Sequence, residues 1–130
     1  MLRAVAVEQV EHARVAWVDT DAGGRIHFTA AFRWAEVAET ALMRRLGLLD
    51  GWGNYPRRRV EADYRNVLRF EDEIAIHLRV ERVGTTSITY GWTIAKDGDL
   101  YVEGSHTVVH VDARGRPSPL PELVRAALAG

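Results

Sequence analysis

Apolar and polar residues alternate over several short stretches of this chain, which is the pattern of half-buried β-strands. The predicted strands cover residues 10–18, 58–66, 74–81, 88–94 and 100–111. The alternation is clearest where every second residue is large and apolar, from Ile74 to Val80 and from Ile88 to Ile94. Gly84-Thr85 and Asp97-Gly98 are typical of tight turns between neighbouring strands. Short links between successive strands predict an antiparallel sheet.

One stretch has the period of a helix instead, from Thr29 to Leu46, about 25 Å long at 1.5 Å per residue. Thr29 is a suitable N-cap residue, with a hydroxyl that can accept from an early helix N–H. Gly47 is a natural residue just beyond the helix end. The apolar stripe is broad, so we expect the helix to be covered on most sides. The stripe consists of Phe32, Trp34, Ala35, Val37, Ala38, Ala41, Leu42, Met43 and Leu46.

The order of elements predicts an α+β fold in a single domain, residues 1–130, with one long helix packed on one curled antiparallel sheet. A second, short helix is predicted over Glu122 to Leu128, after three prolines that break the chain. One helix covers little of a five-stranded sheet. We therefore expect some apolar surface of the strands to meet a second subunit.

The composition narrows the function classes. The chain has 130 residues, 47% of them hydrophobic, and a net charge of −1. That balance offers no basic surface for nucleic acid or for an anionic membrane. Cysteine is absent, which excludes disulfides and thiolate chemistry. No apolar run is long enough to span a membrane, and the first ten residues lack the apolar core of a signal peptide, so we expect a cytoplasmic protein.

The candidate chemistry lies just before the long helix, where Asp19 and Asp21 precede the pair Gly23-Gly24. Glycine permits a tight turn there, and a helix N-terminus presents free N–H groups and partial positive charge. Such an end can hold a carbonyl oxygen while a nearby carboxylate acts on the carbonyl carbon. Alternatively, both carboxylates only bind N–H groups of the turn. Spacing alone leaves these two interpretations open.

Other polar residues are more ambiguous. Glu36 falls beside the apolar stripe, where a structural role and an indirect role in the site are equally open, whereas Glu39 reads as a solvated or ion-paired helix residue. His27 either lines the site or packs beside it. His106 and His110 are spaced as zinc ligands would be on a helix. On a strand, however, four residues separate them by roughly 13 Å, so we expect no metal site.

The run Arg57–Arg59 is either a solvated face or a grip for the phosphates of a nucleotide-bearing substrate. The solvated face is the favoured interpretation. The chain contains none of the glycine-rich phosphate loops or nucleophile elbows that would indicate other enzyme classes.

Taken together, these stretches resemble the 4-hydroxybenzoyl-CoA thioesterase group of the hotdog-fold superfamily. The resemblance rests on DTDAGG after a strand, a long helix ending in LGL, the stretch DYRNVLRFEDEI, the Gly-Thr-Thr-Ser turn at Gly84 and the closing GRPSPLP. It implies a hotdog fold, a long central helix wrapped by a five- or six-stranded antiparallel sheet. It also implies a homodimer or homotetramer with active sites at the dimer interface, acting on acyl-CoA without a cofactor.

The resemblance also implies roles for individual residues. Asp21 would be the catalytic carboxylate, acting as general base or nucleophile, and Asp19 would be structural. Backbone N–H groups near Phe28 and Thr29 would polarise the thioester carbonyl. The predicted substrate-binding residues are His27, Phe28, Thr29, Ala31 and Glu36.

The chain departs from the family pattern at the start of the helix. Many members have Tyr-His-Ala-Asn-Tyr after the glycine pair, where this chain has His27, Phe28, Thr29, Ala30 and Ala31. We therefore expect a more open or more apolar acyl pocket, suited to apolar or aromatic acyl groups. Trp52 and Tyr55 would close over it, either from the same subunit or from the partner subunit.

Two alternatives to an acyl-CoA thioesterase remain at this point. One is a thioesterase that acts on acyl groups held by a carrier protein. The other is a hotdog domain that binds acyl-CoA without hydrolysing it.

Overall fold

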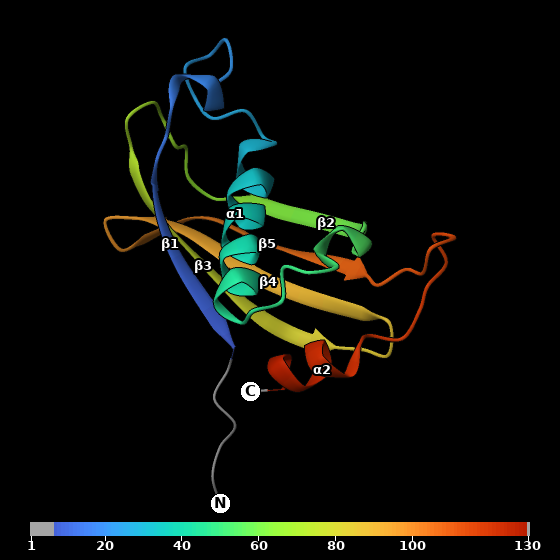
Figure 1. Ribbon diagram of the computed structural model, residues 1–130. Helices are drawn as coiled ribbons and strands as arrows, with labels where there is room; N and C mark the ends of the chain where they lie inside the picture. The colour runs from blue at the N-terminus through green and yellow to red at the C-terminus, as the bar shows by residue number, and fades with distance from the viewer. Residues whose placement is uncertain (1–6, 130) are drawn as a thin grey trace, which may run out of the picture.

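A computed structural model describes residues 7–129 of the chain (Figure 1). The expectation about a leader segment therefore falls partly on residues 1–6, which lie outside the described range together with residue 130. The strands are β1 (Glu8–Arg14), β2 (Arg57–Tyr64), β3 (Glu73–Val83), β4 (Ser87–Lys96) and β5 (Asp99–Val109). The helices are α1 (Ala30–Arg45) and α2 (Glu122–Leu128), with short 3-10 turns at Trp17–Asp19 and Trp52–Asn54.

The five strands form one antiparallel sheet in the order β1-β3-β4-β5-β2. As predicted, Asp97 and Gly98 link β4 to β5 in a two-residue turn, with left-handed φ angles of 52° and 82°. Both residues must adopt positive φ in the turn type that matches the twist of a hairpin. The sheet curls round α1, which lies across its inner face, and α2 sits at one end (Figure 1).

The core lies between α1 and the inner face of the sheet, which confirms the predicted α+β architecture. Alternation places Ile74, Ile76 and Leu78 of β3 inward, as predicted, and all three are buried. The same holds for Ile88, Tyr90, Trp92 and Ile94 of β4. The helix contributes Ala30, Ala31, Trp34, Ala35, Ala38, Leu42 and Met43 to this core. Small residues in the first turns of α1 allow the helix to lie close to the strands.

The first strand ends earlier than predicted. It ends at Arg14 instead of Val18, and Trp17 is 70% exposed instead of facing the core. The reason is local: the Asp19 carboxylate accepts the Ala16 N–H at 2.8 Å and bends the chain into a 3-10 turn. Alternation of apolar residues does not distinguish a strand from such a turn.

The helix has the predicted position but not the predicted cap. Thr29 precedes the first residue of α1, and its side chain forms no capping hydrogen bond. Its hydroxyl bonds to His27 instead. The apolar stripe is also less completely covered than predicted, because Val37 is 56% exposed. Gly47 does follow the helix with a left-handed φ of 72°.

In the part of the chain that the structure describes, strand β2 is an edge of the sheet and pairs with β5 alone. Helix α1 packs most closely on β1 and β3. Val60 and Tyr64, which share a face with the buried His106 and Val102 of β5, are therefore 47% and 44% exposed. None of the helices within residues 7–129 is both long and apolar enough to cross a membrane.

Candidate functional site

The Asp21 turn is held by its own backbone. The Asp21 N–H donates to the Arg25 carbonyl at 2.7 Å, and the Gly24 N–H donates to the Asp21 carbonyl at 3.1 Å. Gly24 has a φ of +78°, which a residue with a side chain adopts only at a cost. One carboxylate oxygen of Asp21 accepts the Gly23 N–H at 2.8 Å. The other has no hydrogen-bond donor within the described residues, so it is available to a ligand.

Asp19 differs from Asp21 in its burial and in having partners for both carboxylate oxygens. It is 5% exposed, and its two carboxylate oxygens accept from the Ala16 N–H and from the Arg33 guanidinium, at 2.8 and 2.9 Å. Its carbonyl also accepts the His27 N–H at 2.7 Å. All of its bonds hold the chain before the helix, which supports the structural role expected of this residue.

Asp21 opens onto a hollow of about 450 Å³ between the loop before α1 and the segment after β2. Three of the predicted site residues, Asp21, His27 and Phe28, line it together. The rest of the lining is Arg25, Ile26, Tyr64, Asn66, Val67 and Leu68. Apolar walls with a few polar groups are typical of small-molecule sites. The expected meeting of the aspartate turn with the helix start is therefore present.

His27 is fixed on several sides. Its Nδ1 lies 2.7 Å from the Thr29 hydroxyl and 3.3 Å from the Thr29 backbone N. Its ring stacks on the Phe28 ring, with centroids 4.7 Å apart. Both side chains are exposed, Phe28 by 63%. Thr29 thus belongs to the site as a partner of His27.

The residues on the far wall of the hollow, Tyr64 and Asn66, were not predicted from the sequence. The Tyr64 hydroxyl donates to the Phe28 carbonyl, and the Asn66 amide donates to the Leu100 carbonyl at 2.8 Å. Burial raises the pKa of Tyr64, which keeps it a neutral donor. The bond from Tyr64 fixes the peptide that follows Phe28, at the entry to α1. The stretch DYRNVLRFEDEI marked the family resemblance, but nothing in its pattern indicated that Tyr64 reaches the helix start.

The backbone N–H of Phe28 pairs with no acceptor within residues 7–129. The Thr29 N–H makes only its long contact with His27. These are the two amides predicted to polarise a carbonyl. Within the described residues the Phe28 N–H is therefore available, as an oxyanion-binding role requires, whereas the Thr29 N–H points at His27.

Other predicted site residues lie elsewhere. Ala31 is completely buried in the core, so the predicted contact between Ala31 and an acyl group is not made in this arrangement. Glu36 projects outward from α1, 3.8 Å from the Arg57 guanidinium, and does not line the hollow. Trp52 and Tyr55 stack on each other, and Tyr55 packs against His110. The expectation that these two rings close the pocket from the same subunit is wrong.

A second polar cluster lies under the middle of α1 and was not foreseen as a unit. Glu39 is completely buried, and its Oε1 accepts from His106 Nε2 at 2.9 Å and from the Arg57 guanidinium at 2.5 Å. The Trp92 indole N–H donates to His106 Nδ1 at 3.2 Å. Glu39 is therefore ion-paired, as one predicted alternative held, but not solvated. Arg57 thus contributes to this cluster, although all three residues of the run Arg57–Arg59 are exposed, as the favoured interpretation held.

Two atoms of this cluster lack partners. The Tyr90 hydroxyl and the second carboxylate oxygen of Glu39 are buried without a hydrogen bond to any residue from 7 to 129. Burial raises the pKa of Tyr90 well above its ordinary value, and the Glu39 charge adds to the effect. No hollow opens onto these groups among those found in the described chain.

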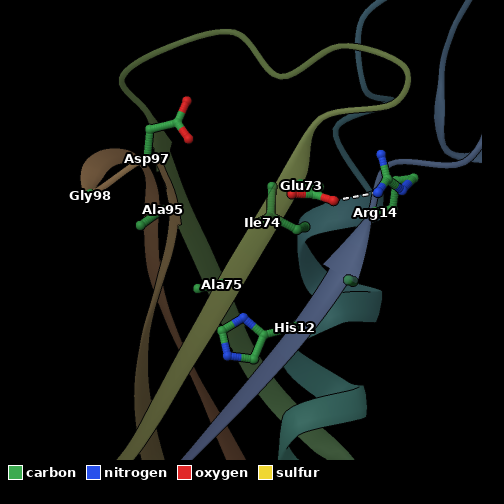
Figure 2. A pocket seen from close by; sticks show the side chains of 9 residues that line it. His12, Arg14, Glu73, Ile74, Ala75, Ala95, Asp97 and Gly98 are labelled. Carbon is green, nitrogen blue, oxygen red and sulfur yellow. Dashed lines mark hydrogen bonds and ion pairs between the residues drawn. The ribbon is translucent and has the colours of Figure 1, made fainter.

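A larger hollow, of about 610 Å³, lies over β1, β3 and the β4–β5 turn (Figure 2). It exists because Ala75 and Ala95 are cross-strand neighbours with small side chains. Arg14 and Glu73 form an ion pair at its rim. It contains no amides of a helix start, and we do not assign it as the active site. Across residues 7–129, no three His, Asp or Glu side chains are grouped so as to hold a metal ion.

A sequence model of a family described as the thioesterase-like superfamily matches residues 15–128. A 1,4-dihydroxy-2-naphthoyl-CoA hydrolase of Synechococcus sp. (strain CC9605) is 29% identical over 114 residues, which cover 78% of this chain and 76% of the relative.

Solved structures of known proteins share the fold. A 1,4-dihydroxy-2-naphthoyl-CoA thioesterase from Synechocystis superposes with a TM-score of 0.84 at 15% identity, covering 93% of this chain and 95% of the other. A gentisyl-coenzyme A thioesterase superposes with a TM-score of 0.83 at 23% identity, covering 94% of this chain and 100% of the other. The predicted hotdog fold is therefore confirmed.

Proposed function

This chain belongs to the thioesterase-like superfamily, and on that premise we propose that it hydrolyses acyl-CoA thioesters, with Asp21 as the general base. The observation that carries the proposal is the shared hollow, where a carboxylate with one free oxygen and the Phe28 residue with its unpaired amide meet. In this mechanism Asp21 takes a proton from water as the water adds to the thioester carbonyl. The Phe28 amide stabilises the oxyanion, and coenzyme A leaves as its thiol.

We further propose an aromatic acyl group as the substrate. The apolar walls and the exposed Phe28 and His27 rings suit a flat acyl group. The relatives named above act on dihydroxynaphthoyl and gentisyl thioesters, both of which are hydroxylated aromatic acyl groups. Ala31 plays no part in this pocket, and Glu36 enters it only if a second subunit brings it there.

The test is a panel of thioesters with detection of the released thiol: acetyl-CoA, hexanoyl-CoA, benzoyl-CoA, a hydroxybenzoyl-CoA and the same acyl groups on a carrier protein. We expect the aromatic CoA thioesters to have the highest kcat/KM. Faster hydrolysis of the carrier-protein substrates would favour the first alternative. A binding domain without activity would raise its melting temperature with acyl-CoA but release no thiol.

We also propose that the chain acts as a homodimer, or as a tetramer of such dimers, in the cytoplasm. Strand β2 offers an unpaired edge, and Val60 and Tyr64 beside it expose apolar surface that a second copy would cover. Light scattering should give at least twice the chain mass of 14.6 kDa at micromolar concentration. A particle of single-chain mass would contradict the assembly, and cell fractionation tests the location.

A further inference from the structure

The His27 ring carries its proton on a defined nitrogen. The Thr29 backbone N–H, which only donates, points at His27 Nδ1 from 3.3 Å. Nδ1 must therefore be the unprotonated, accepting nitrogen, and the Thr29 hydroxyl at 2.7 Å donates to it as well. The single proton of the neutral ring is then on Nε2.

The Nε2–H group is free to act on a ligand. It has no acceptor within residues 7–129, and the His27 side chain lines the hollow that also holds Asp21. The His27 backbone is anchored at both ends, since its N–H donates to the Asp19 carbonyl at 2.7 Å and its carbonyl accepts the Ala30 N–H at 2.9 Å. Stacking on Phe28 limits rotation of the ring. The His27 ring thus supplies an oriented side-chain N–H donor in a largely apolar wall.

We infer that His27 is a specificity-determining residue, whose Nε2–H donates to an oxygen substituent on the aromatic acyl group, and that Thr29 positions it by fixing the tautomer. This inference rests on the proposed thioesterase function. A donor left without a partner in an apolar site disfavours a substrate that lacks the oxygen. The enzyme should therefore discriminate hydroxylated from unsubstituted aromatic acyl groups.

The experiment compares kcat/KM for benzoyl-CoA with that for the 2-, 3- and 4-hydroxybenzoyl-CoA isomers. We expect the wild-type enzyme to prefer at least one isomer by about threefold to tenfold, the worth of one neutral hydrogen bond. The ratio of that isomer to benzoyl-CoA is then measured in variants whose folding is checked by circular dichroism.

Three variants at position 27 separate the possible roles. His27→Gln places an amide N–H near the Nε2 position and should keep most of the preference. His27→Asn places its polar group only near the Nδ1 position, and His27→Phe has no donor; both should bring the ratio close to one. Thr29→Val, which removes the hydroxyl but keeps the backbone N–H, should lower the ratio part of the way.

Two outcomes overturn the inference while leaving the proposed function intact. In the first, the wild type hydrolyses aromatic CoA thioesters without preference for any hydroxylated isomer. In the second, His27→Phe lowers kcat/KM for all four substrates by the same factor, which would place the donor on the thioester itself. Failure of the wild type to hydrolyse any acyl-CoA would instead overturn the proposed function.

Discussion

Two parts of the molecule combine a carboxylate with a histidine beside α1, and they differ in what remains free. At the helix start, Asp21 and His27 line a hollow, and each keeps one polar atom that has no partner among the described residues. Under the middle of the helix, Glu39 and His106 are buried and bonded to each other. Both histidines use Nδ1 as an acceptor, from Thr29 in one case and from Trp92 in the other.

The difference lies in where the second nitrogen points. The Nε2–H of His106 donates to Glu39, whose negative charge is paired with Arg57. A buried charge is tolerated only when it is paired in this way. The Nε2–H of His27 has no such partner in the described chain. A carboxylate and a histidine therefore indicate a binding site when one of their hydrogen-bonding atoms has no partner and faces a cavity. They indicate a structural role when no such atom faces a cavity.

The largest effect is expected from breaking the buried cluster. Glu39→Ala leaves the His106 N–H buried without an acceptor and removes the partner of Arg57, so it should lower the free energy of unfolding by about 3–5 kcal/mol. Glu36→Ala is the matched control, because Glu36 lies on the same helix, 64% exposed, beside the same arginine. We expect it to change stability by less than about 0.5 kcal/mol. Urea unfolding measures both, and similar small losses for the two variants would refute the structural role of Glu39.

At the helix start, substitution of Asp21 should lower activity and leave stability almost unchanged. Asp21→Asn removes the proposed base from an exposed turn, so kcat/KM should fall on the order of 10²-fold or more while the melting temperature hardly changes. Asp19→Asn, which disrupts the buried bonds to Ala16 and Arg33, should chiefly lower the melting temperature. A fully active, folded Asp21→Asn enzyme would remove Asp21 from the mechanism.

A smaller loss of stability is expected from substitution of Gly104, which leaves room for the Trp92 indole of the buried cluster. Gly104 lies opposite Trp92 on the inner face of the sheet. A Cβ at this position would come within 2.4 Å of the indole ring and 2.5 Å of the Glu61 carbonyl oxygen. Gly104→Ala should therefore cost about 1–3 kcal/mol by displacing the indole from His106. Gly53→Ala is the control, since nothing lies within 4 Å of its Cβ position. Equal stability of the two variants would show that the indole has room to move.

The sequence predicted the sheet well because its inner face is continuous and apolar. Alternation in β3 and β4 leaves one register that buries Ile76 and Trp92, and the Asp97-Gly98 turn fixes how the last two strands meet. The Asp21 turn was also predictable, since a glycine pair before a helix start permits backbone angles, such as the φ of +78° at Gly24, that other residues adopt only at a cost. The extent of the first strand was not, because the bond from Asp19 to Ala16 overrides the alternation.

Of the two polar clusters, the one at Asp21 was predicted from the sequence and the one at Glu39 was not, for a physical reason. The turn at Asp21 is local, whereas Glu39 and His106 are 67 residues apart in the chain. Periodicity did carry a signal: Glu39 follows Ala35 by four residues and precedes Met43 by four, and both of those are buried. Its charge led to the expectation of a helix surface. The contact of Tyr64 with Phe28 had no signal of this kind, since it depends on how β2 ends beside the helix.

The smallest effect is expected from the hydroxyl that has no partner. Tyr90→Phe removes an unbonded buried oxygen and keeps the ring in the core, so stability should change by less than about 1 kcal/mol, toward higher stability. Tyr64→Phe is the comparison at the helix start, where the hydroxyl donates to the Phe28 carbonyl. It should cost about 0.5–1.5 kcal/mol and lower kcat/KM, because the peptide after Phe28 loses its anchor. A loss above 1.5 kcal/mol for Tyr90→Phe would mean that this hydroxyl is bonded in solution. The unpartnered oxygen of Glu39, whose charge already acts on Tyr90, is the acceptor to test. With that bond every polar atom of the buried cluster would be paired, in contrast to the open site at Asp21.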